Sequence, residues 1–217
     1  MPIMIRDFNN LFAQMSGMPI NSRDGRNLLK NNGIDTNSKQ YQAVMKRMNA
    51  SVGAGVGYTN PQAIKNLMKS YDKDGNYISP SSGLAGLTVT EENIAQKHHI
   101  ISILESSREE MYEVTKREFL NGNGIADAET TKRSDVYINL YKKMPVKDRL
   151  AAGNSLRQYE RAYRQAFIDA AKAVDPKWEL GKPIEPDALD NVSREDIDSS
   201  LKKTDGRFVQ SNIDLQI

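Results

Sequence analysis

Two short turns rich in oxygen-bearing side chains carry the residues of this sequence best suited to chemistry. The first turn, DKDGN, places Asp72, Asp74 and Asn76 around a glycine. Calcium binds such loops through carboxylate and amide oxygens, which makes these three residues candidate ligands. In the register of a helix–loop–helix calcium site, however, Tyr77 stands at the glycine position and Gly83 at the position of the bidentate glutamate. A tight β-hairpin turn centred on the Asp-Gly pair is the alternative interpretation.

The second turn, NGNGIADAE, offers Asn121, Asn123 and Asp127 as further candidate calcium ligands. It resembles the degenerate calcium loops of dockerin-like and thrombospondin-repeat proteins. Asparagines stand where those families mostly carry aspartates, and Phe119 occupies the first ligand position. The lower negative charge weakens the hold on a divalent cation. The alternative is a glycine-rich helix stop followed by a cap from Asp127.

Other patterns that carry catalysis are weak in this sequence. His98 and His99 are adjacent, so on a helix they point about 100° apart and cannot share a metal ion as an i, i+4 pair does. The chain has no cysteine, which excludes disulfides, thiolate zinc sites and cysteine nucleophiles, and it has no Gly-x-Ser-x-Gly turn. We therefore expect no cofactor other than calcium and favour a protein without enzymatic activity. An active site assembled from distant residues is the alternative, because it leaves no motif.

The charge balance argues against a dedicated nucleic-acid binder. Thirty basic and 28 acidic residues give a net charge of +2, far from the concentrated positive field that such proteins carry. One predicted helix does combine arginine with tyrosine, at Arg149, Arg157, Tyr159, Arg161, Tyr163 and Arg164. These residues suit either contact with phosphates and bases or amphipathic cover beside a buried tyrosine stripe. We favour the second interpretation and expect a protein partner and no nucleic acid.

The start of the sequence bears on localisation. Arg6 and Asp7 interrupt the first apolar residues, so we expect no cleavable signal peptide, and no later stretch approaches the length of a membrane span. We expect a soluble protein. The compartment stays open between the cytoplasm and export without a cleavable signal, because a chain without cysteine is compatible with both.

The elements that position the candidate residues are mostly helices. Apolar residues recur at spacings of three and four, and capping residues or proline precede several of these stretches. The expected helices span about 4–15, 26–32, 41–49, 61–71, 91–120, 131–143 and 147–174. Ser193 starts a further short helix to about residue 203, and Phe208 and Val209 suit a terminal extended segment.

These elements predict a mainly α-helical fold. Two long helices, over 91–120 and 147–174, best bury their apolar stripes as an antiparallel bundle. Shorter N-terminal helices, one small β-hairpin at about 71–78 and an irregular C-terminal tail complete the prediction.

The composition also suggests where domains divide. Prolines become frequent after Asp175, at positions 176, 183 and 186. We therefore expect a helical domain over 1–175, with the hairpin and a loop at about 71–89. A polar extension over 176–217 is expected to pack on it.

The stretch GIDTNSKQY, residues 33–41, together with the amphipathic start and the turn at 71–78, resembles a functionally uncharacterised family of Firmicutes proteins. The resemblance implies a bacterial origin and transfers no catalytic residues. Absence of a chemical motif then favours a non-enzymatic interaction or structural protein. A weak calcium-binding module and an enzyme with a non-motif active site are the alternatives.

Overall fold

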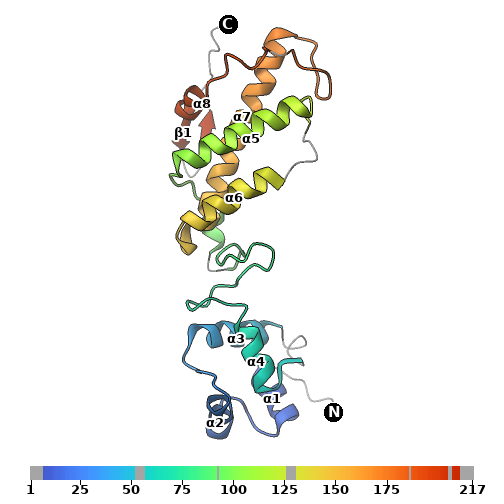
Figure 1. Ribbon diagram of the computed structural model, residues 1–217. Coiled ribbons are helices and arrows are strands. Elements are labelled where there is room, and N and C mark those ends of the chain that lie inside the picture. Colours follow the sequence, from blue (N-terminus) through green and yellow to red (C-terminus); the bar gives the residue numbers. More distant parts are fainter. Residues whose placement is uncertain are drawn as a thin grey trace. The chain divides into compact units, whose positions relative to one another are not determined.

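The computed structural model of the chain describes residues 7–51, 57–91, 93–125, 131–185, 187–204 and 207–210 (Figure 1). The protein is mainly helical, as predicted. Its contacts cluster into two compact units, Met1–Thr88 and Val89–Ile217. The composition had suggested a division near residue 175, whereas the compact units divide between residues 88 and 89. Over the described part of the chain, none of the helices combines the length and apolar character that crossing a membrane requires.

In its described residues, the first unit contains four α-helices: α1 (Phe8–Ser16), α2 (Arg23–Asn31), α3 (Lys39–Ala50) and α4 (Pro61–Met68). Each begins where a side-chain oxygen accepts a backbone N–H of the first turn, which satisfies a donor that the helix itself cannot pair. The capping residues are Asp7, Ser22, Ser38 and Asn60. These short-range signals are why the helices lie close to their predicted ranges.

Apolar faces of the four helices form the core of the first unit. The predicted stripes on α3 and α4 are confirmed, since Val44 and Ile64 are fully buried. Phe8 and Phe12 of α1 contact each other edge to face, with ring centroids 6.2 Å apart. Other buried members of this cluster are Leu11, Ile20, Leu29, Ile34, Tyr41, Met48, Leu67 and Tyr71.

The predicted β-hairpin at 71–78 is not formed. Tyr71 and Tyr77 make one isolated antiparallel bridge, and Ile78 makes another with Ala85. The Tyr71 carbonyl oxygen accepts a hydrogen bond from the Gln40 side chain of α3 at 2.8 Å. The Asp-Gly pair does turn the chain, with Gly75 at φ 84°. The turn prediction was therefore right about the reversal and wrong about the strands.

The second unit contains α5 (Glu105–Asn121), α6 (Thr131–Lys143), α7 (Arg149–Val174) and α8 (Arg194–Ser200). Two short 3-10 helices, η2 (Ile94–His98) and η3 (Val146–Asp148), precede α5 and α7. The expected helix over 91–120 thus begins only at Glu105. Ahead of it, Ile100 is buried and the Ile101 amide donates to the Ser155 hydroxyl of α7 at 2.9 Å. Tertiary contact with α7 therefore overrides the local helical spacing.

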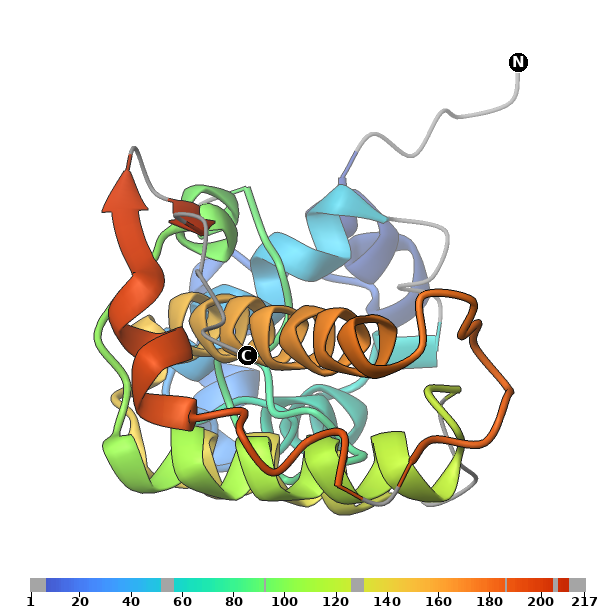
Figure 2. The same ribbon diagram turned by 90° about the horizontal axis from the view of Figure 1, so that it is seen from above.

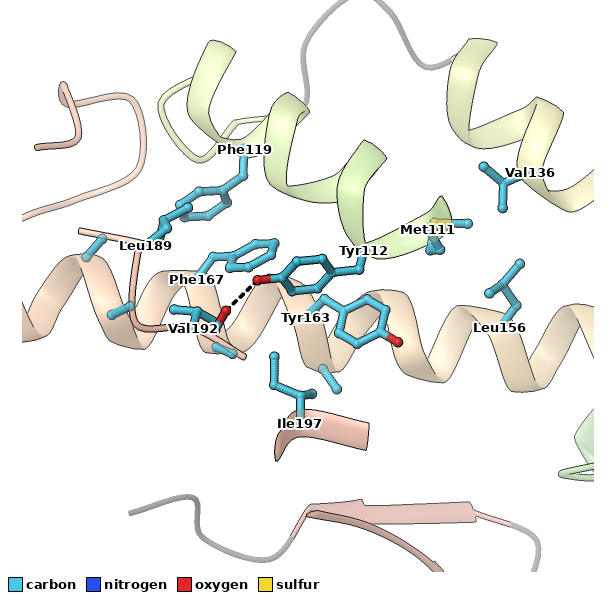
Figure 3. Packing of buried hydrophobic residues seen from close by; sticks show 14 of the residues in the cluster. Met111, Tyr112, Phe119, Val136, Leu156, Tyr163, Phe167, Leu189, Val192 and Ile197 are labelled. Atoms are coloured by element: carbon cyan, nitrogen blue, oxygen red, sulfur yellow. Dashed lines mark hydrogen bonds between the residues drawn. The ribbon is translucent and has the colours of Figure 1, made fainter. Parts of the chain in front are cut away.

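Helices α5, α6 and α7 pack against one another around one core. Tyr112 of α5 contacts Tyr163 of α7, and Phe119 contacts Phe167, which is about two turns further along α5 and about one turn further along α7 (Figure 3). The contacts advance together along both helices, so α5 and α7 run in the same direction. Figure 2 shows their axes lying side by side.

Helix α6 runs the opposite way. Its first turns contact the middle of α7, where Arg133 pairs with Glu160, and its last turn receives a hydrogen bond from the first residue of α7. The prediction that the two long helices are antiparallel was wrong. The chain reverses once between α5 and α6 and again between α6 and α7, so α7 runs in the same direction as α5. Helix α6 is antiparallel to both of them.

The segment after residue 175 covers this core and is not irregular throughout. Trp178 is buried against Phe119, with ring centroids 5.8 Å apart. Helix α8 packs on α7 through the buried Ile197. Strands β1 (Leu201–Thr204) and β2 (Arg207–Gln210) then pair antiparallel, with Leu201 opposite Gln210. The extension therefore adds a helix and a two-stranded sheet to the second unit.

Candidate functional site

The first predicted calcium turn brings its three candidate ligands together, but it occupies their oxygens. The Asp72 Oδ1 accepts the amide N–H of Asp74 at 3.0 Å, the amide N–H of Asn76 at 2.9 Å and the Asn76 side-chain amide at 3.2 Å. The Asp74 carboxylate lies 3.5 Å from the Lys39 ammonium. The carboxylate of Asp72 thus receives donors from its own loop. A cation bound there would share this carboxylate with the donors of its own loop.

The second predicted calcium turn ends α5. Asn121 is the last residue of the helix, and Asn123 and Gly124 follow at φ 50° and 80°. The Asn123 carbonyl oxygen accepts the Gly181 amide at 2.8 Å, and the Gly124 carbonyl oxygen accepts a hydrogen bond from the Arg164 guanidinium. The alternative of a helix stop is therefore what the described residues form. Asp127, the remaining candidate ligand, lies outside the described residues.

The two histidines close the 3-10 helix η2 and are exposed. The His99 carbonyl oxygen, and not its ring, is the group that accepts a hydrogen bond from Asn154 at 3.2 Å. Among the described residues, no group of three histidine, aspartate or glutamate side chains is placed to hold a metal ion.

Sequence reasoning missed a cluster of ionisable side chains that joins α5, α7 and α8, which we call the α8 clamp: Arg108, Tyr163, Arg194 and Asp198. The Asp198 side chain is only 8% exposed. Its Oδ2 accepts hydrogen bonds from Arg108 and Arg194, both at 2.8 Å. Its Oδ1 accepts the Tyr163 hydroxyl at 2.6 Å. Three donors from three helices therefore converge on one carboxylate.

The surroundings of the α8 clamp keep its tyrosine protonated. Burial raises the pKa of Tyr163, and the hydrogen bond to the Asp198 carboxylate raises that pKa further because it stabilises the protonated phenol. Burial likewise raises the pKa of the neighbouring Tyr159, over whose ring the Arg108 guanidinium lies at 5.4 Å. The phenol is thus a hydrogen-bond donor and not a base, and its role in the cluster is to hold α7 against α8.

A second cluster, which we call the Arg133 network, joins α5, α6 and α7 through Glu118, Arg133, Tyr137 and Glu160. Arg133 lies between two carboxylates, 2.6 Å from Glu118 and 2.8 Å from Glu160. Tyr137 donates to Glu160 at 2.7 Å. Burial and then the Glu160 charge raise the pKa of Tyr137. The cluster fixes the three helices of the bundle to one another.

One local signal pointed to the α8 clamp, and the rest was invisible in the sequence. Arg194 and Asp198 stand four residues apart on a predicted helix, a spacing that favours an ion pair. Arg108 and Tyr163, however, are 90 and 35 residues from Asp198 along the chain. Pairings of that range depend on how helices pack, which no spacing rule contains.

Comparison with known proteins places the chain in a family. Neither the curated proteins nor the solved structures contain a match to it. A family model, however, matches residues 34–217, which is most of the chain and includes all of the second unit. The resemblance to an uncharacterised family is thereby confirmed, whereas the Firmicutes origin stays a prediction. The chain belongs to the family described as "Domain of unknown function (DUF3879)".

Proposed function

We propose that this protein is a non-enzymatic interaction or structural module. The observation that carries the proposal is the α8 clamp, a group of largely buried ionisable side chains in the part of the chain that the structure describes. Each oxygen of the Asp198 carboxylate already accepts a protein donor. Groups that could supply acid–base chemistry are thus used to fasten α8 to the bundle, and function is left to the outer surfaces.

An exposed apolar patch at one end of the second unit supports the same proposal. Ile125 and Leu180 are each 53% exposed. They lie on neighbouring segments, because the Gly181 amide donates to the carbonyl oxygen of Asn123. Large aliphatic side chains that gather on a surface favour contact with another macromolecule. A protein partner accounts for them better than a small substrate does, because the side chains project from turns.

The finer expectations belong to this proposal. We keep a protein as the expected partner, and we keep two compartments, the cytoplasm and export without a cleavable signal. Calcium binding at Asp72, Asp74 and Asn76, or at the turn after Asn121, stays a prediction. A thermal unfolding scan of chelator-treated protein with and without millimolar calcium tests it, because a ligand of the folded state raises its melting temperature.

Photo-crosslinking tests the interaction proposal. A photoreactive amino acid is introduced at position 125 or 180, and the protein is irradiated in extracts of the cells that make it. We expect a discrete, saturable adduct that unlabelled protein competes away. Unlabelled protein that carries both Ile125→Asp and Leu180→Asp should no longer compete, whereas unlabelled protein that carries Leu104→Asp should still compete. Leu104 is the matched control, because it is also an exposed aliphatic residue, at the N-terminal end of α5.

An enzymatic result would contradict the proposal. The purified protein is assayed against a broad panel of hydrolase substrates, in parallel with Asp198→Asn. Turnover by the wild type that disappears in a folded Asp198→Asn variant would place catalysis in the α8 clamp. In that case the cluster would be an active site and the interaction proposal would fail.

A further inference from the structure

Three asparagine residues of the sequence are each followed by glycine, at positions 32, 121 and 123. In such a pair the backbone nitrogen of the glycine can attack the side-chain carbonyl carbon (Cγ) of the asparagine, because glycine has no side chain that hinders the approach. The N–Cγ bond forms, the bond between Cγ and the side-chain nitrogen breaks, and ammonia leaves. Water then opens the cyclic succinimide and gives aspartate or isoaspartate. The fold decides which of the three pairs is free to react.

The pair at Asn32 lies at an exposed helix end. Asn32 is the residue that follows α2, and both Asn32 and Gly33 are exposed. The Gly33 amide donates to the Lys30 carbonyl oxygen at 2.9 Å. The Asn32 side-chain amide donates to the Leu28 carbonyl oxygen at 2.8 Å. Both hydrogen bonds belong to the last turn of the helix, where water replaces them when the end of the helix frays.

Ring closure at Asn32 requires a rotation of its backbone, because at the observed ψ of 12° the glycine nitrogen is turned away from Cγ. The surroundings of Gly33 give room for this rotation. A methyl group built on Gly33 would meet the Lys65 ammonium at 3.3 Å, and that group is the end of a flexible side chain. Local opening of the helix end is therefore the barrier that the structure sets at this pair.

The fold obstructs the same reaction at Asn123. Gly124 is buried, and its amide donates to the Phe119 carbonyl oxygen at 2.7 Å. A methyl group built on Gly124 would meet the Trp178 indole at 2.7 Å. The Gly124 carbonyl oxygen also accepts a hydrogen bond from the Arg164 guanidinium. Rotation at this pair therefore requires the displacement of buried groups of the second unit.

The pair at Asn121 lies between these two cases. Asn121 is exposed, but it is the last residue of α5, and the Gly122 amide donates to the Glu118 carbonyl oxygen at 3.0 Å. Gly122 is half-buried, and the obstructed turn at Asn123 follows it directly. Opening at Asn121 therefore strains a neighbour that the core of the second unit holds in place.

We propose that Asn32 is a site of spontaneous deamidation, which places a carboxylate at the C-terminal end of α2. The new charge arises close to a cation, since the Asn32 carbonyl oxygen accepts a hydrogen bond from the Lys65 ammonium of α4 at 3.4 Å. A negative charge at the C-terminal end of a helix is nevertheless unfavourable. Isoaspartate also lengthens the main chain by one carbon atom just before the buried Ile34. The deamidated first unit is therefore expected to unfold more easily.

Peptide mapping by mass spectrometry tests the proposal on the full chain. The protein is incubated at mildly alkaline pH, where the glycine amide loses its proton more readily, and the mass increase of each asparagine–glycine peptide is followed with time. We expect Asn32 to react at least about tenfold faster than Asn123, because opening at Asn123 has to displace buried groups. Methylation by an isoaspartyl methyltransferase should label the peptide that contains position 32.

The unfolded chain is the matched control. In concentrated denaturant the three pairs lose their structural differences, so their rates should become similar. Asn32→Gln is a second control, because the longer side chain has to close a larger ring and reacts more slowly. After incubation, wild-type protein should lose part of the melting temperature of its first unit, measured by circular dichroism. The Asn32→Gln variant should keep its own.

Two results would overturn the proposal. If Asn123 lost its amide as fast as Asn32 in the folded protein, exposure of the helix end would not control the reaction. If Asn32 reacted in denaturant but kept its amide in the folded protein, the hydrogen bonds of the last turn would be protecting it. The proposal is independent of the interaction function, which crosslinking at positions 125 and 180 tests separately.

Discussion

Asparagine at position 198 is the substitution that best tests the α8 clamp. The change keeps the shape of the side chain and removes the negative charge on which Arg108, Arg194 and Tyr163 converge. An asparagine has one carbonyl oxygen, so it cannot accept all three hydrogen bonds. Its NH₂ group is itself a donor and would face a donor of the α8 clamp instead of an acceptor. The two guanidinium groups are left close to each other with no carboxylate between them.

The expected cost follows from burial and from the partners that remain. Removing one member of a buried ion pair costs about 3–5 kcal/mol. Arg194 keeps its contacts with Glu105 and Glu195, and Arg108 is 23% exposed, so water compensates part of the loss. We therefore expect about 2–4 kcal/mol of lost stability. At about 3–4 °C per kcal/mol for a unit of this size, the melting temperature should fall by about 6–16 °C.

Tryptophan fluorescence measures this effect in the right part of the molecule. Trp178 is the single tryptophan of the chain and is buried in the second unit against Phe119, so its emission reports the unfolding of that unit. Asp196→Asn is the matched control, because Asp196 is an exposed aspartate on the same helix. If Asp198→Asn lost no more stability than Asp196→Asn, the convergence of donors on Asp198 would contribute nothing measurable. The account of the α8 clamp would then be refuted.

Three further predictions concern single positions. Burial raises the pKa of Tyr112 to about 12, so the stabilising contribution of this tyrosine is full below pH 10 and is lost as pH rises from about 10 to about 12. Tyr112→Phe should therefore make the denaturation midpoint fall less steeply with pH over that window. An unchanged slope would contradict the assignment. Gly124→Ala should lower stability more than Gly181→Ala, by about 1–3 kcal/mol in urea unfolding, since both glycines have positive φ but the added methyl meets an indole ring at 2.7 Å only at position 124. Asp72→Asn should lower the free energy of unfolding of the first unit by about 1–3 kcal/mol, measured by circular dichroism, because it weakens three hydrogen bonds to a carboxylate. Asp74→Asn, which removes only an exposed ion pair, should change that free energy by less than about 1 kcal/mol. Equal effects would contradict the local account of this turn.

Local interactions explain what could be predicted about the fold. Caps such as Ser38 and Asn60 act within one helical turn, and the apolar spacing on α3, α4 and α7 needs no knowledge of distant residues. The mainly helical class and most helix ranges therefore followed from the chain alone. The helix stop at Asn121 did so too, because asparagine and glycine accommodate the left-handed backbone that follows it at Asn123 and Gly124.

The site was harder to predict than the fold. The two turns singled out for calcium contain ligand types that suit the ion, and calcium binding there stays a prediction. In the folded chain, Asp72 accepts its own loop amides and the Gly124 carbonyl accepts Arg164. Which donors reach an oxygen depends on the folded backbone, and composition does not record it. The sequence therefore named residues capable of the chemistry without deciding whether they were available for it.

The sequence by itself determined that this protein is a mainly helical member of a family of unknown function, with helices bounded by caps, glycines and prolines. Tertiary structure alone decided that α5 and α7 run in the same direction, that the helix expected from residue 91 begins at Glu105, and that Asp198 gathers donors from three helices. The reason is the range of the interactions. Helical periodicity and capping act over about four residues, whereas packing and buried ion pairs join residues up to 90 positions apart.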